Sequence, residues 1–263
     1  MAVHGLIRGV VVGLAWTVVS AVGSVQVAQV AQAAEVSVAV AANFTAPMQQ
    51  IAAAFARDTG HHAVLSFGST GKFYAQIKNG APFQVLLAAD AQTPARLESE
   101  GLAAPGTRFT YAIGRLVLWS RQPGLVDAVG GVLRTGTFER IAIANPKLAP
   151  YGAAAMQVLE QRHLLPRLQA RLVRGENIAQ TYQFVDSGNA ALGFVALSQV
   201  MAQGRITEGS AWVVPGELHT PLRQDAMVLA QGKNHAAAHA LLAYLKSDTA
   251  RSIMNGFGYE VPN

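Results

Sequence analysis

Apolar residues along the chain follow two alternating patterns: short runs, and longer stretches in which they recur every three or four positions. The run VSVAVAA, residues 36–42, has the first pattern, and Ile51 and Phe55 belong to a stretch with the second. The first pattern predicts a strand, and the second predicts an amphipathic helix. Pro47 suits the first turn of this helix, and Gly60 suits its end.

The same order of strand and helix repeats through the rest of the chain. Further strands are predicted at HAVLSF, FQVLLAA, RIAIAN, RLVRG, AALGFVAL and QDAMVLA, with helices between most of them. Residues 111–120 form one longer strand pattern, after which the alternation starts afresh, and a final helix is expected over about residues 236–256. Repeated strand–helix units predict mostly parallel sheets with helices on both faces. Two such sheets joined by crossing strands would form a hinged cleft.

The N-terminal segment differs from this pattern. Arg8 is its only Lys or Arg, an apolar run follows over residues 9–25, and Ala31 and Ala33 form an Ala-x-Ala site. These features predict a secretory signal peptide over residues 1–33. A retained membrane anchor is the alternative, because the apolar run is nearly long enough to span a bilayer. The small-residue cleavage site favours the signal peptide, so we expect a periplasmic protein.

Composition and charge exclude several classes of function. The 263 residues include no cysteine, which removes disulfide frameworks, thiolate metal sites and a lipidated N-terminal Cys. Basic residues are scattered and the formal net charge is only +5, so we expect no nucleic-acid partner. Apolar residues make up 51% of the chain, which is ample for a packed core.

The stretch LSFGSTGKFYAQIKNG, residues 65–80, gathers hydroxyls, glycines and lysines where a strand pattern gives way to a helix pattern. A phosphate-binding P-loop is excluded, because Ser66 and Phe73 stand where that motif needs a Gly and a hydroxyl residue. Ser69 and Lys72 match the S-x-x-K motif of serine β-lactamases, but the chain lacks the accompanying S-D-N and K-T-G motifs. A serine hydrolase that uses these two residues stays open as an alternative.

Several predicted turns between a strand and a helix carry small or hydroxyl residues. They are Asn43 before the first helix, Ser69 and Thr70 before the second, Tyr151 and Gly152 before the third, and Asn177 and Ile178 before the fourth. Free backbone N–H groups and the positive end of the helix dipole suit each turn to an anion. Two pairs that converge across a cleft would surround a tetrahedral dianion with neutral donors. The alternative is that these residues are ordinary helix caps.

Four longer segments resemble one known family. VAVAANFTAPMQQIAAAF, SFGSTGKFYAQIKNGAPFQVLLAAD, IANPKLAPYGAAAMQVL and NIAQTYQFVDSGNAALGFV are similar to the molybdate-binding periplasmic proteins of ABC importers. The resemblance implies the α/β fold of two-lobed class II periplasmic binding proteins, with a mostly parallel sheet flanked by helices in each lobe and crossover hinge strands between them. With this fold, lobe I is expected to comprise residues 34–115 and 224–263, and lobe II residues 116–223.

The resemblance also implies the anion ligands. Matched position by position, they are Asn43 with the backbone of the adjacent Ala42, the hydroxyls of Thr70 and the adjacent Ser69, and the backbone N–H groups of Tyr151 and Ile178. Ala196 stands where some members of the family have a tyrosine hydroxyl, so that donor is missing. Gln84 stands where the family usually has Asp.

The function implied by the resemblance is that of a receptor, without catalytic residues, that captures molybdate or tungstate and delivers it to a membrane-embedded ABC permease. No cofactor and no direct coordination of a metal by side chains are expected, because molybdenum is bound as its oxyanion. We expect a monomer. Sulfate or another tetrahedral oxyanion is the alternative ligand, since neutral donors satisfy it as well.

Overall fold

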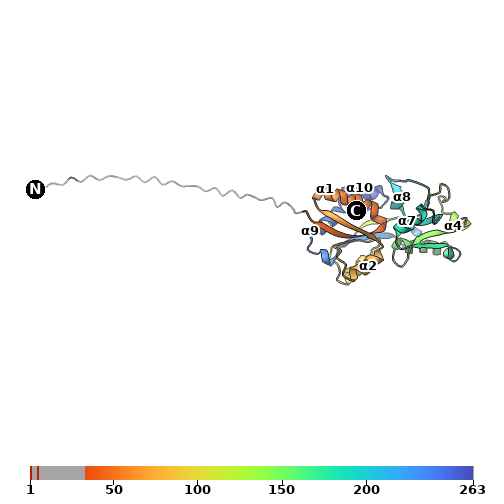
Figure 1. Cartoon of the computed structure of the whole chain (residues 1–263), viewed down its shortest axis with the longest axis horizontal. Helices are drawn as coiled ribbons and strands as arrows, with labels where there is room; N and C mark the ends of the chain where they lie inside the picture. The colour runs from red at the N-terminus through yellow and green to blue at the C-terminus, as the bar shows by residue number, and fades with distance from the viewer. Residues whose placement is uncertain (2–4, 6–32, 263) are drawn as a thin grey trace. The chain divides into compact units, whose positions relative to one another are not determined.

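The computed structural model describes residues 1, 5 and 33–262, and residues from Ala33 onward form one compact unit. The predicted signal peptide therefore lies almost wholly outside the described residues. Figure 1 shows two groups of elements within this unit, one with α1, α2, α9 and α10 and the other with α4, α7 and α8. Among the described helices, none combines the length and apolar character that a membrane span requires.

The first group is built on a five-stranded sheet with the order β2-β1-β3-β12-β4. Its strands are β1 (Glu35–Ala41), β2 (His62–Gly68), β3 (Val85–Leu87), β4 (Phe109–Gly114) and β12 (Leu222–Val228). Its helices are α1 (Thr45–Thr59), α2 (Thr70–Lys78), α3 (Gln92–Ser99), α9 (Ala236–Tyr244) and α10 (Asp248–Gly256), and a short 3-10 turn (Ala42–Phe44) precedes α1. The strands β2, β1 and β3 are parallel, and β12 is antiparallel to both of its neighbours.

The second group is built on a sheet with the order β11-β5-β8-β6-β7. Its strands are β5 (Leu116–Ser120), β6 (Ile141–Ala144), β7 (Leu172–Gly175), β8 (Leu192–Ala196) and β11 (Ser210–Val213). The remaining elements are α4 (Val132–Thr135), α5 (Pro150–Gln161), α6 (Leu165–Leu168), α7 (Ile178–Asp186), α8 (Leu197–Val200) and a hairpin of β9 (Met201–Ala202) and β10 (Arg205–Ile206). Again three neighbouring strands are parallel, and the pairs of β5 with β8 and β11 are antiparallel.

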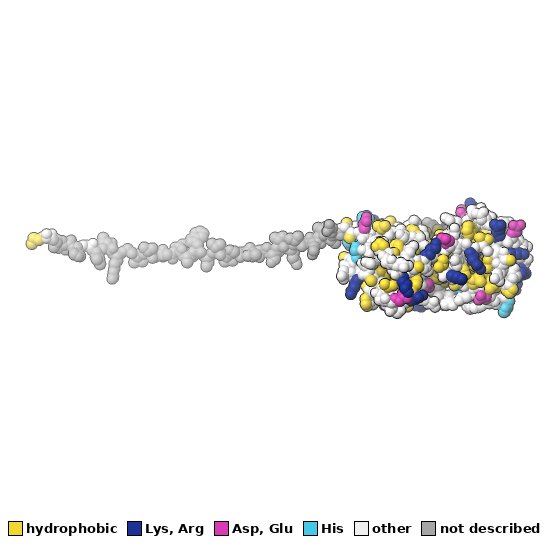
Figure 2. Space-filling model, turned by 60° about the horizontal axis from the view of Figure 1, so that its bottom comes forward, with side chains coloured by type: hydrophobic (Ala, Val, Ile, Leu, Met, Phe, Trp, Pro, Cys, Tyr) yellow, Lys and Arg dark blue, Asp and Glu magenta, His cyan; other side chains and the backbone are white. Residues whose placement is uncertain are grey.

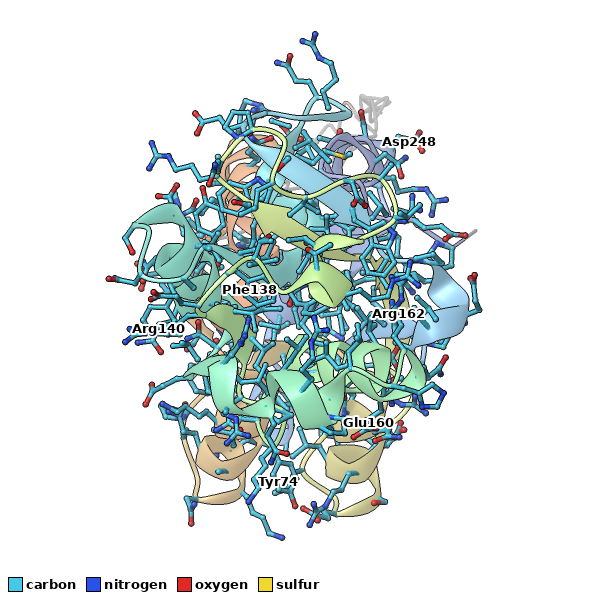
Figure 3. The ribbon with its side chains drawn as sticks, turned by 90° about the vertical axis from the view of Figure 1, so that its right-hand side faces the viewer. Tyr74, Phe138, Arg140, Glu160, Arg162 and Asp248 are labelled. Atoms are coloured by element: carbon cyan, nitrogen blue, oxygen red, sulfur yellow. The ribbon has the colours of Figure 1, made fainter. Side chains whose placement is uncertain are left out.

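Helices bury both faces of each sheet. In the first sheet, Val38 of β1 packs on one face with Phe55 of α1, and Ala39 packs on the other with Phe73 of α2. Continuous burial of successive residues is typical of a parallel strand covered on both faces. Figure 3 shows the protein from the side of the second sheet, with Tyr74 of α2 and Asp248 of α10 at opposite ends of the view.

The strand expected over residues 111–120 is in fact two strands. β4 ends at Gly114 in the first sheet, and β5 begins at Leu116 in the second. The chain crosses between the sheets here, and a Cβ at Gly114 would overlap the Tyr151 hydroxyl and the Gln224 amide, so this position requires glycine. A second crossing follows β11 and leads into β12.

The single helix expected over residues 236–256 was also wrong, because the structure has α9 and α10 with a break between them. Ser247 lies in the break with extended backbone, and its Oγ accepts a hydrogen bond from the N–H of Ala250 at 3.3 Å. A serine that caps a new helix stabilises this interruption.

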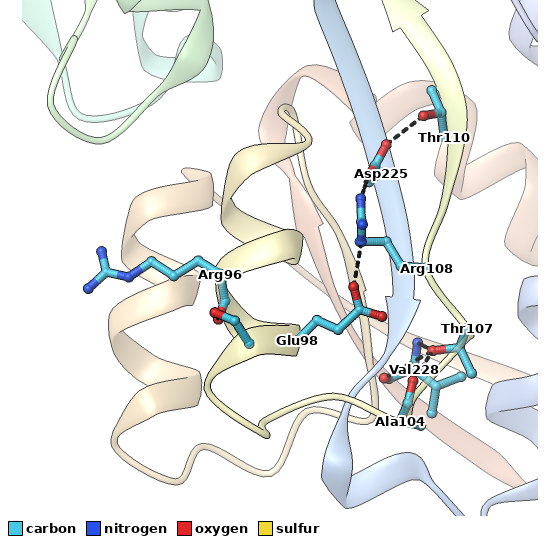
Figure 4. A network of polar contacts seen from close by, with 9 residues as sticks. Arg96, Glu98, Ala104, Thr107, Arg108, Thr110, Asp225 and Val228 are labelled. Carbon is cyan, nitrogen blue, oxygen red and sulfur yellow. Dashed lines mark hydrogen bonds and ion pairs between the residues drawn. The ribbon is translucent and has the colours of Figure 1, made fainter.

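A buried charge network fixes β12 against β4 (Figure 4). Asp225 accepts a hydrogen bond from Thr110 Oγ1 at 2.7 Å and pairs with Arg108 Nη1 at 2.9 Å. Arg108 also pairs with Glu98 at 2.9 Å. The register of β12 shifts between Gln224 and Asp225, and both side chains are buried. The network therefore holds the segment of β12 that faces the second sheet.

Candidate functional site

A small cavity with a volume of ≈ 10 Å³ lies where five connections between a strand and a helix meet. Its lining comes from the end of β1, the β2–α2 turn, the loop after β3, and the starts of α5 and α7. It contains all six residues that the resemblance implied as ligands: Ala42, Asn43, Ser69, Thr70, Tyr151 and Ile178. The structure thus brings together residues that are up to 136 positions apart in the sequence.

The wall from the first sheet offers side-chain hydroxyls. Thr70 Oγ1 accepts a hydrogen bond from the N–H of Ala89 at 3.0 Å, so its own hydrogen is free to be donated. Ser69 Oγ is buried and has no partner among the described residues. Although Ser69 occupies the N-cap position of α2, its side chain makes no capping bond. A helix cap therefore does not account for this hydroxyl.

The wall from the second sheet offers helix N-termini. Tyr151 and Ile178 lie in the first turns of α5 and α7, where backbone N–H groups have no acceptor within the helix. Both helices point the positive ends of their dipoles at the cavity. Asn177 is an ordinary cap, as the alternative interpretation held, because its side chain accepts from the N–H of Gln180 at 3.0 Å.

Asn43 belongs to a buried polar network behind the cavity. Its Nδ2 donates to Gln224 Oε1 and to Tyr259 Oη, both at 2.9 Å, whereas its Oδ1 has no partner. Gln224 Nε2 donates in turn to Tyr151 Oη at 3.1 Å, so the hydroxyl of Tyr151 lies in this network. Ser198 Oγ donates to the carbonyl oxygen of Asn43 at 2.8 Å and ties the start of α8 to the same turn.

The sequence analysis did not identify the network partners Gln224, Tyr259, Tyr111 and Ser198. Gln224 and Tyr259 lie 181 and 216 residues from Asn43 along the chain. No local motif marks them. Only the polar residue in the otherwise apolar run QDAMVLA was a usable signal.

The site is electrically neutral. No Asp, Glu, Lys or Arg is among the residues that line the cavity. Burial raises the pKa of Tyr111 and of Tyr151 well above the ordinary value, and it raises the pKa of Tyr259 to about 12. The three phenols therefore stay protonated around neutral pH. A dianion in this cavity is met by hydrogen-bond donors and helix dipoles alone.

The two sheets are in contact around the cavity. The N–H of Gly71 in α2 donates to the carbonyl oxygen of Leu148, just before α5, at 2.9 Å. Lys72 Nζ pairs with Glu176 Oε2, just before α7, at 2.6 Å, and both side chains are exposed. These two contacts join the groups of elements on either side of the cavity.

The geometry does not support the serine hydrolase alternative. A nucleophilic Ser69 needs Lys72 as its base within hydrogen-bond reach. Instead Lys72 pairs with Glu176, and Ser69 Oγ has no partner. Lys72 is also absent from the cavity lining.

A larger groove of ≈ 450 Å³ lies beside the cavity and shares with it Ala89, Ala149 and Pro150. Two of its polar side chains are engaged: Asp90 accepts from the N–H of Thr93 at 2.7 Å, and Gln157 Oε1 accepts from the N–H of Thr220 at 2.8 Å. Figure 2 shows Lys and Arg side chains spread over the face in view and interspersed with Asp and Glu.

Comparison with known proteins gives a consistent result. Residues 36–260 match the family model described as bacterial extracellular solute-binding protein. The molybdate-binding protein ModA of Azotobacter vinelandii is 57% identical over 241 residues, which cover 92% of this chain and 96% of the relative. The ModA of Rhodobacter capsulatus is 49% identical, covering 87% of this chain and 89% of the relative.

The solved structure of an Azotobacter vinelandii periplasmic molybdate-binding protein superimposes with a TM-score of 0.84 at 43% identity, covering 87% of this chain and all of that one. These matches confirm the resemblance that the motifs indicated. They also confirm the two-lobed α/β fold class.

Proposed function

Because this chain belongs to the bacterial extracellular solute-binding protein family, we propose that it is a periplasmic receptor for molybdate that serves an ABC permease. The observation that carries the proposal is the neutral cavity, where donors from four strand–helix turns converge without any charged side chain. Near-complete coverage of relatives named molybdate-binding supports it. The chain acts by binding and release, with no cofactor and no catalytic step.

Six residues are proposed to hold the anion. Ser69 and Thr70 donate through their hydroxyls, and Ala42, Tyr151 and Ile178 donate through backbone N–H groups. Asn43 contributes from the turn that follows β1. Hydrogen bonds from neutral groups to a charged acceptor are stronger than those between neutral partners. Molybdenum is therefore held through oxygen, without a bond to any side chain.

Tungstate is proposed as a second ligand, because it is a dianion of the same tetrahedral form. Monoprotonated phosphate is disfavoured, because its own hydrogen needs an acceptor and no carboxylate lines the cavity. Sulfate is also met by neutral donors and is smaller than molybdate, so a preference for molybdate rests on donors spaced to reach the oxygens of the larger ion.

The division into lobes and the periplasmic location of the protein are part of the proposal. Lobe I comprises residues 34–115 and 224–263, and lobe II residues 116–223; the two sheets, with crossings at Gly114 and before β12, support this division. Residues 1–33 are proposed to be a signal peptide and the exported protein a monomer. A ligand that contacts both lobes favours the closed state, and the permease would recognise that state.

Thermal unfolding of anion-free protein tests the function. Molybdate and tungstate at a hundred times the dissociation constant are each expected to add about 2.7 kcal/mol of stability. Sulfate and phosphate at the same concentration serve as controls and should leave the midpoint nearly unchanged. An equal shift of the unfolding midpoint with sulfate would contradict the proposed specificity for molybdate. If none of the four anions shifts the midpoint, the proposed function is wrong.

A further inference from the structure

The two walls of the cavity are joined backbone to backbone beside the proposed anion donors. The N–H of Gly71 in α2 donates to the carbonyl oxygen of Leu148 at 2.9 Å. Gly71 follows Thr70, whose side chain lines the cavity. Leu148 lies three residues before Tyr151, whose N–H is a proposed donor from the other wall. This hydrogen bond therefore links the two sets of donors over a few residues of chain.

The same hydrogen bond caps α2 from the opposite wall. The first N–H groups of a helix have no acceptor within the helix, and a serine before the helix usually accepts from one of them. Ser69 precedes α2 but makes no such bond. The carbonyl oxygen of Leu148 instead accepts from the N–H of Gly71, the second residue of the helix. Ser69 Oγ is thereby left without a partner among the described residues and stays available to a ligand.

The space around Gly71 has no room for a side chain. A Cβ at this position would lie 3.0 Å from the Cα and 3.0 Å from the carbonyl oxygen of Leu148. Both atoms belong to the backbone, so rotation of a side chain cannot relieve the overlap. The φ of Gly71 lies outside the left-handed region, so its own conformation does not require glycine, and alanine is the better helix former. The close approach of the two walls is therefore what requires glycine here.

Both sides of this contact are held within their own wall. The N–H of Leu148 donates to the carbonyl oxygen of Asn145 at 3.0 Å, and the N–H of Asn145 donates to the carbonyl oxygen of Gly175, at the end of β7, at 2.7 Å. On the opposite side, Thr70 Oγ1 accepts from the N–H of Ala89 at 3.0 Å, which fixes the start of α2 to the loop after β3. A contact between two fixed segments sets the distance between the walls.

Other contacts near the cavity join the walls through side chains. Lys72 Nζ lies 2.6 Å from Glu176 Oε2, and Gln224 Nε2 donates to Tyr151 Oη at 3.1 Å. The flexible stem of a lysine lets its ion pair follow a small change in the distance between the walls. Lys72 and Glu176 are also exposed, so their ion pair is weak. The backbone contact of Gly71 is the more rigid limit on how closely the walls approach each other.

We propose that Gly71 is a positioning residue of the anion site: its backbone contact with Leu148 sets the separation of the two walls, and with it the distance that one anion must span to reach the donors of both. The inference rests on the proposed function and deepens it. Hydrogen bonds weaken once donor and acceptor are more than about 3.2 Å apart. A side chain at position 71 spreads the walls, so a bound anion loses hydrogen bonds to one of them.

Substitutions of Gly71 test this role by isothermal titration calorimetry with molybdate. Gly71→Ala should bind molybdate about tenfold or more weakly than wild type, and the larger Gly71→Val should bind it more weakly still. The unfolding midpoint of anion-free Gly71→Ala should stay close to that of wild type, because alanine favours the helix and separation of the walls relieves the overlap.

Gly256→Ala is the matched control. Gly256 ends α10, and its carbonyl oxygen accepts from the N–H of Gly204, in the second group of elements, at 3.2 Å. It therefore takes part in a backbone contact of the same kind, but a Cβ at Gly256 meets nothing from outside its own helix within 4 Å. The affinity of Gly256→Ala for molybdate should stay within about twofold of wild type.

The outcomes separate this inference from the proposed function. Wild-type affinity in Gly71→Ala, or a smaller loss in Gly71→Val than in Gly71→Ala, would overturn the positioning role and leave the receptor function intact. An equal loss in Gly256→Ala, or a large drop in the anion-free midpoint of Gly71→Ala, would assign the effect to general damage and also overturn it. Wild-type protein that binds no oxyanion in calorimetry would overturn the proposed function itself.

Discussion

The two walls of the cavity present hydrogen-bond donors by different means. The wall from the first sheet uses the side-chain hydroxyls of Ser69 and Thr70, whereas the amide hydrogens of Asn43 are engaged with Gln224 and Tyr259. The wall from the second sheet uses the backbone at the starts of α5 and α7. Backbone donors are set by the helix and survive most substitutions, whereas side-chain donors depend on residue identity and on the groups behind them. Selectivity should therefore reside mainly in the first wall.

The largest effect is expected from Asn43→Asp. A carboxylate has no hydrogen to donate in either orientation, and a like charge beside the ligand costs several kcal/mol. Molybdate affinity should fall by about a hundredfold or more in isothermal titration calorimetry. Asn43→Ala, which removes the amide without adding charge, should lose only about 1 to 3 kcal/mol. Equal losses in the two variants would contradict the claim that this wall must be free of acceptors.

The comparison between the walls is sharpened by Thr70→Val and Ile178→Val. Thr70→Val keeps the shape and removes the hydroxyl, so molybdate binding should weaken by about 1.5 to 3 kcal/mol, the usual value for a hydrogen bond to a charge. Ile178→Val keeps the backbone N–H, so its affinity should stay within about twofold of wild type. Similar losses in both, measured by calorimetry, would show that the second wall does not act through its backbone.

The network behind the first wall should make stability fall at high pH. The pKa of Tyr259 is raised by burial to about 12, above that of an exposed tyrosine, so the folded protein holds this proton more tightly than the unfolded chain does. Its contribution is fully present below about pH 10 and is lost as the pH rises towards about 12. Denaturant unfolding should show a decline of roughly 1 kcal/mol per pH unit in this range.

The variant Tyr259→Phe tests whether Tyr259 causes this loss of stability at high pH. It removes the titrating group, so stability should fall less steeply between pH 10 and 12 than in wild type. If stability falls with pH as steeply in the variant as in wild type, Tyr259 does not cause the decline. The decline would then be assigned to the other two buried phenols, Tyr111 and Tyr151.

The smallest effect is expected at the contact that joins the walls outside the cavity. Lys72 and Glu176 are exposed, and exposed ion pairs contribute at most about 1 kcal/mol. Lys72→Met should therefore weaken molybdate binding by less than about tenfold at low salt, and high salt should abolish the difference because ions screen exposed charges. A loss that is large or independent of salt would place Lys72 in the site itself.

Local patterns were enough to predict the elements that carry the site. The strand over residues 36–42 and the helices that begin near Thr70, Tyr151 and Ile178 are marked by apolar spacing and by small or hydroxyl residues at their starts. Helix starts at the carboxyl ends of parallel strands gather at one edge of a sheet. Together with the family resemblance, these patterns identified the cavity residues before any contact between them was known.

The sequence by itself indicated which turns between a strand and a helix carry small or hydroxyl residues, because caps, spacing and side-chain chemistry are local properties. Only the tertiary structure decided how the donors of these turns are oriented. The crossing at Gly114, the pairing of Lys72 with Glu176 and the bonds of Asn43 with Gln224 join residues that lie 37 to 181 positions apart. Such contacts depend on how the two sheets pack, and a buried amide takes its direction from neighbours that no local pattern reveals.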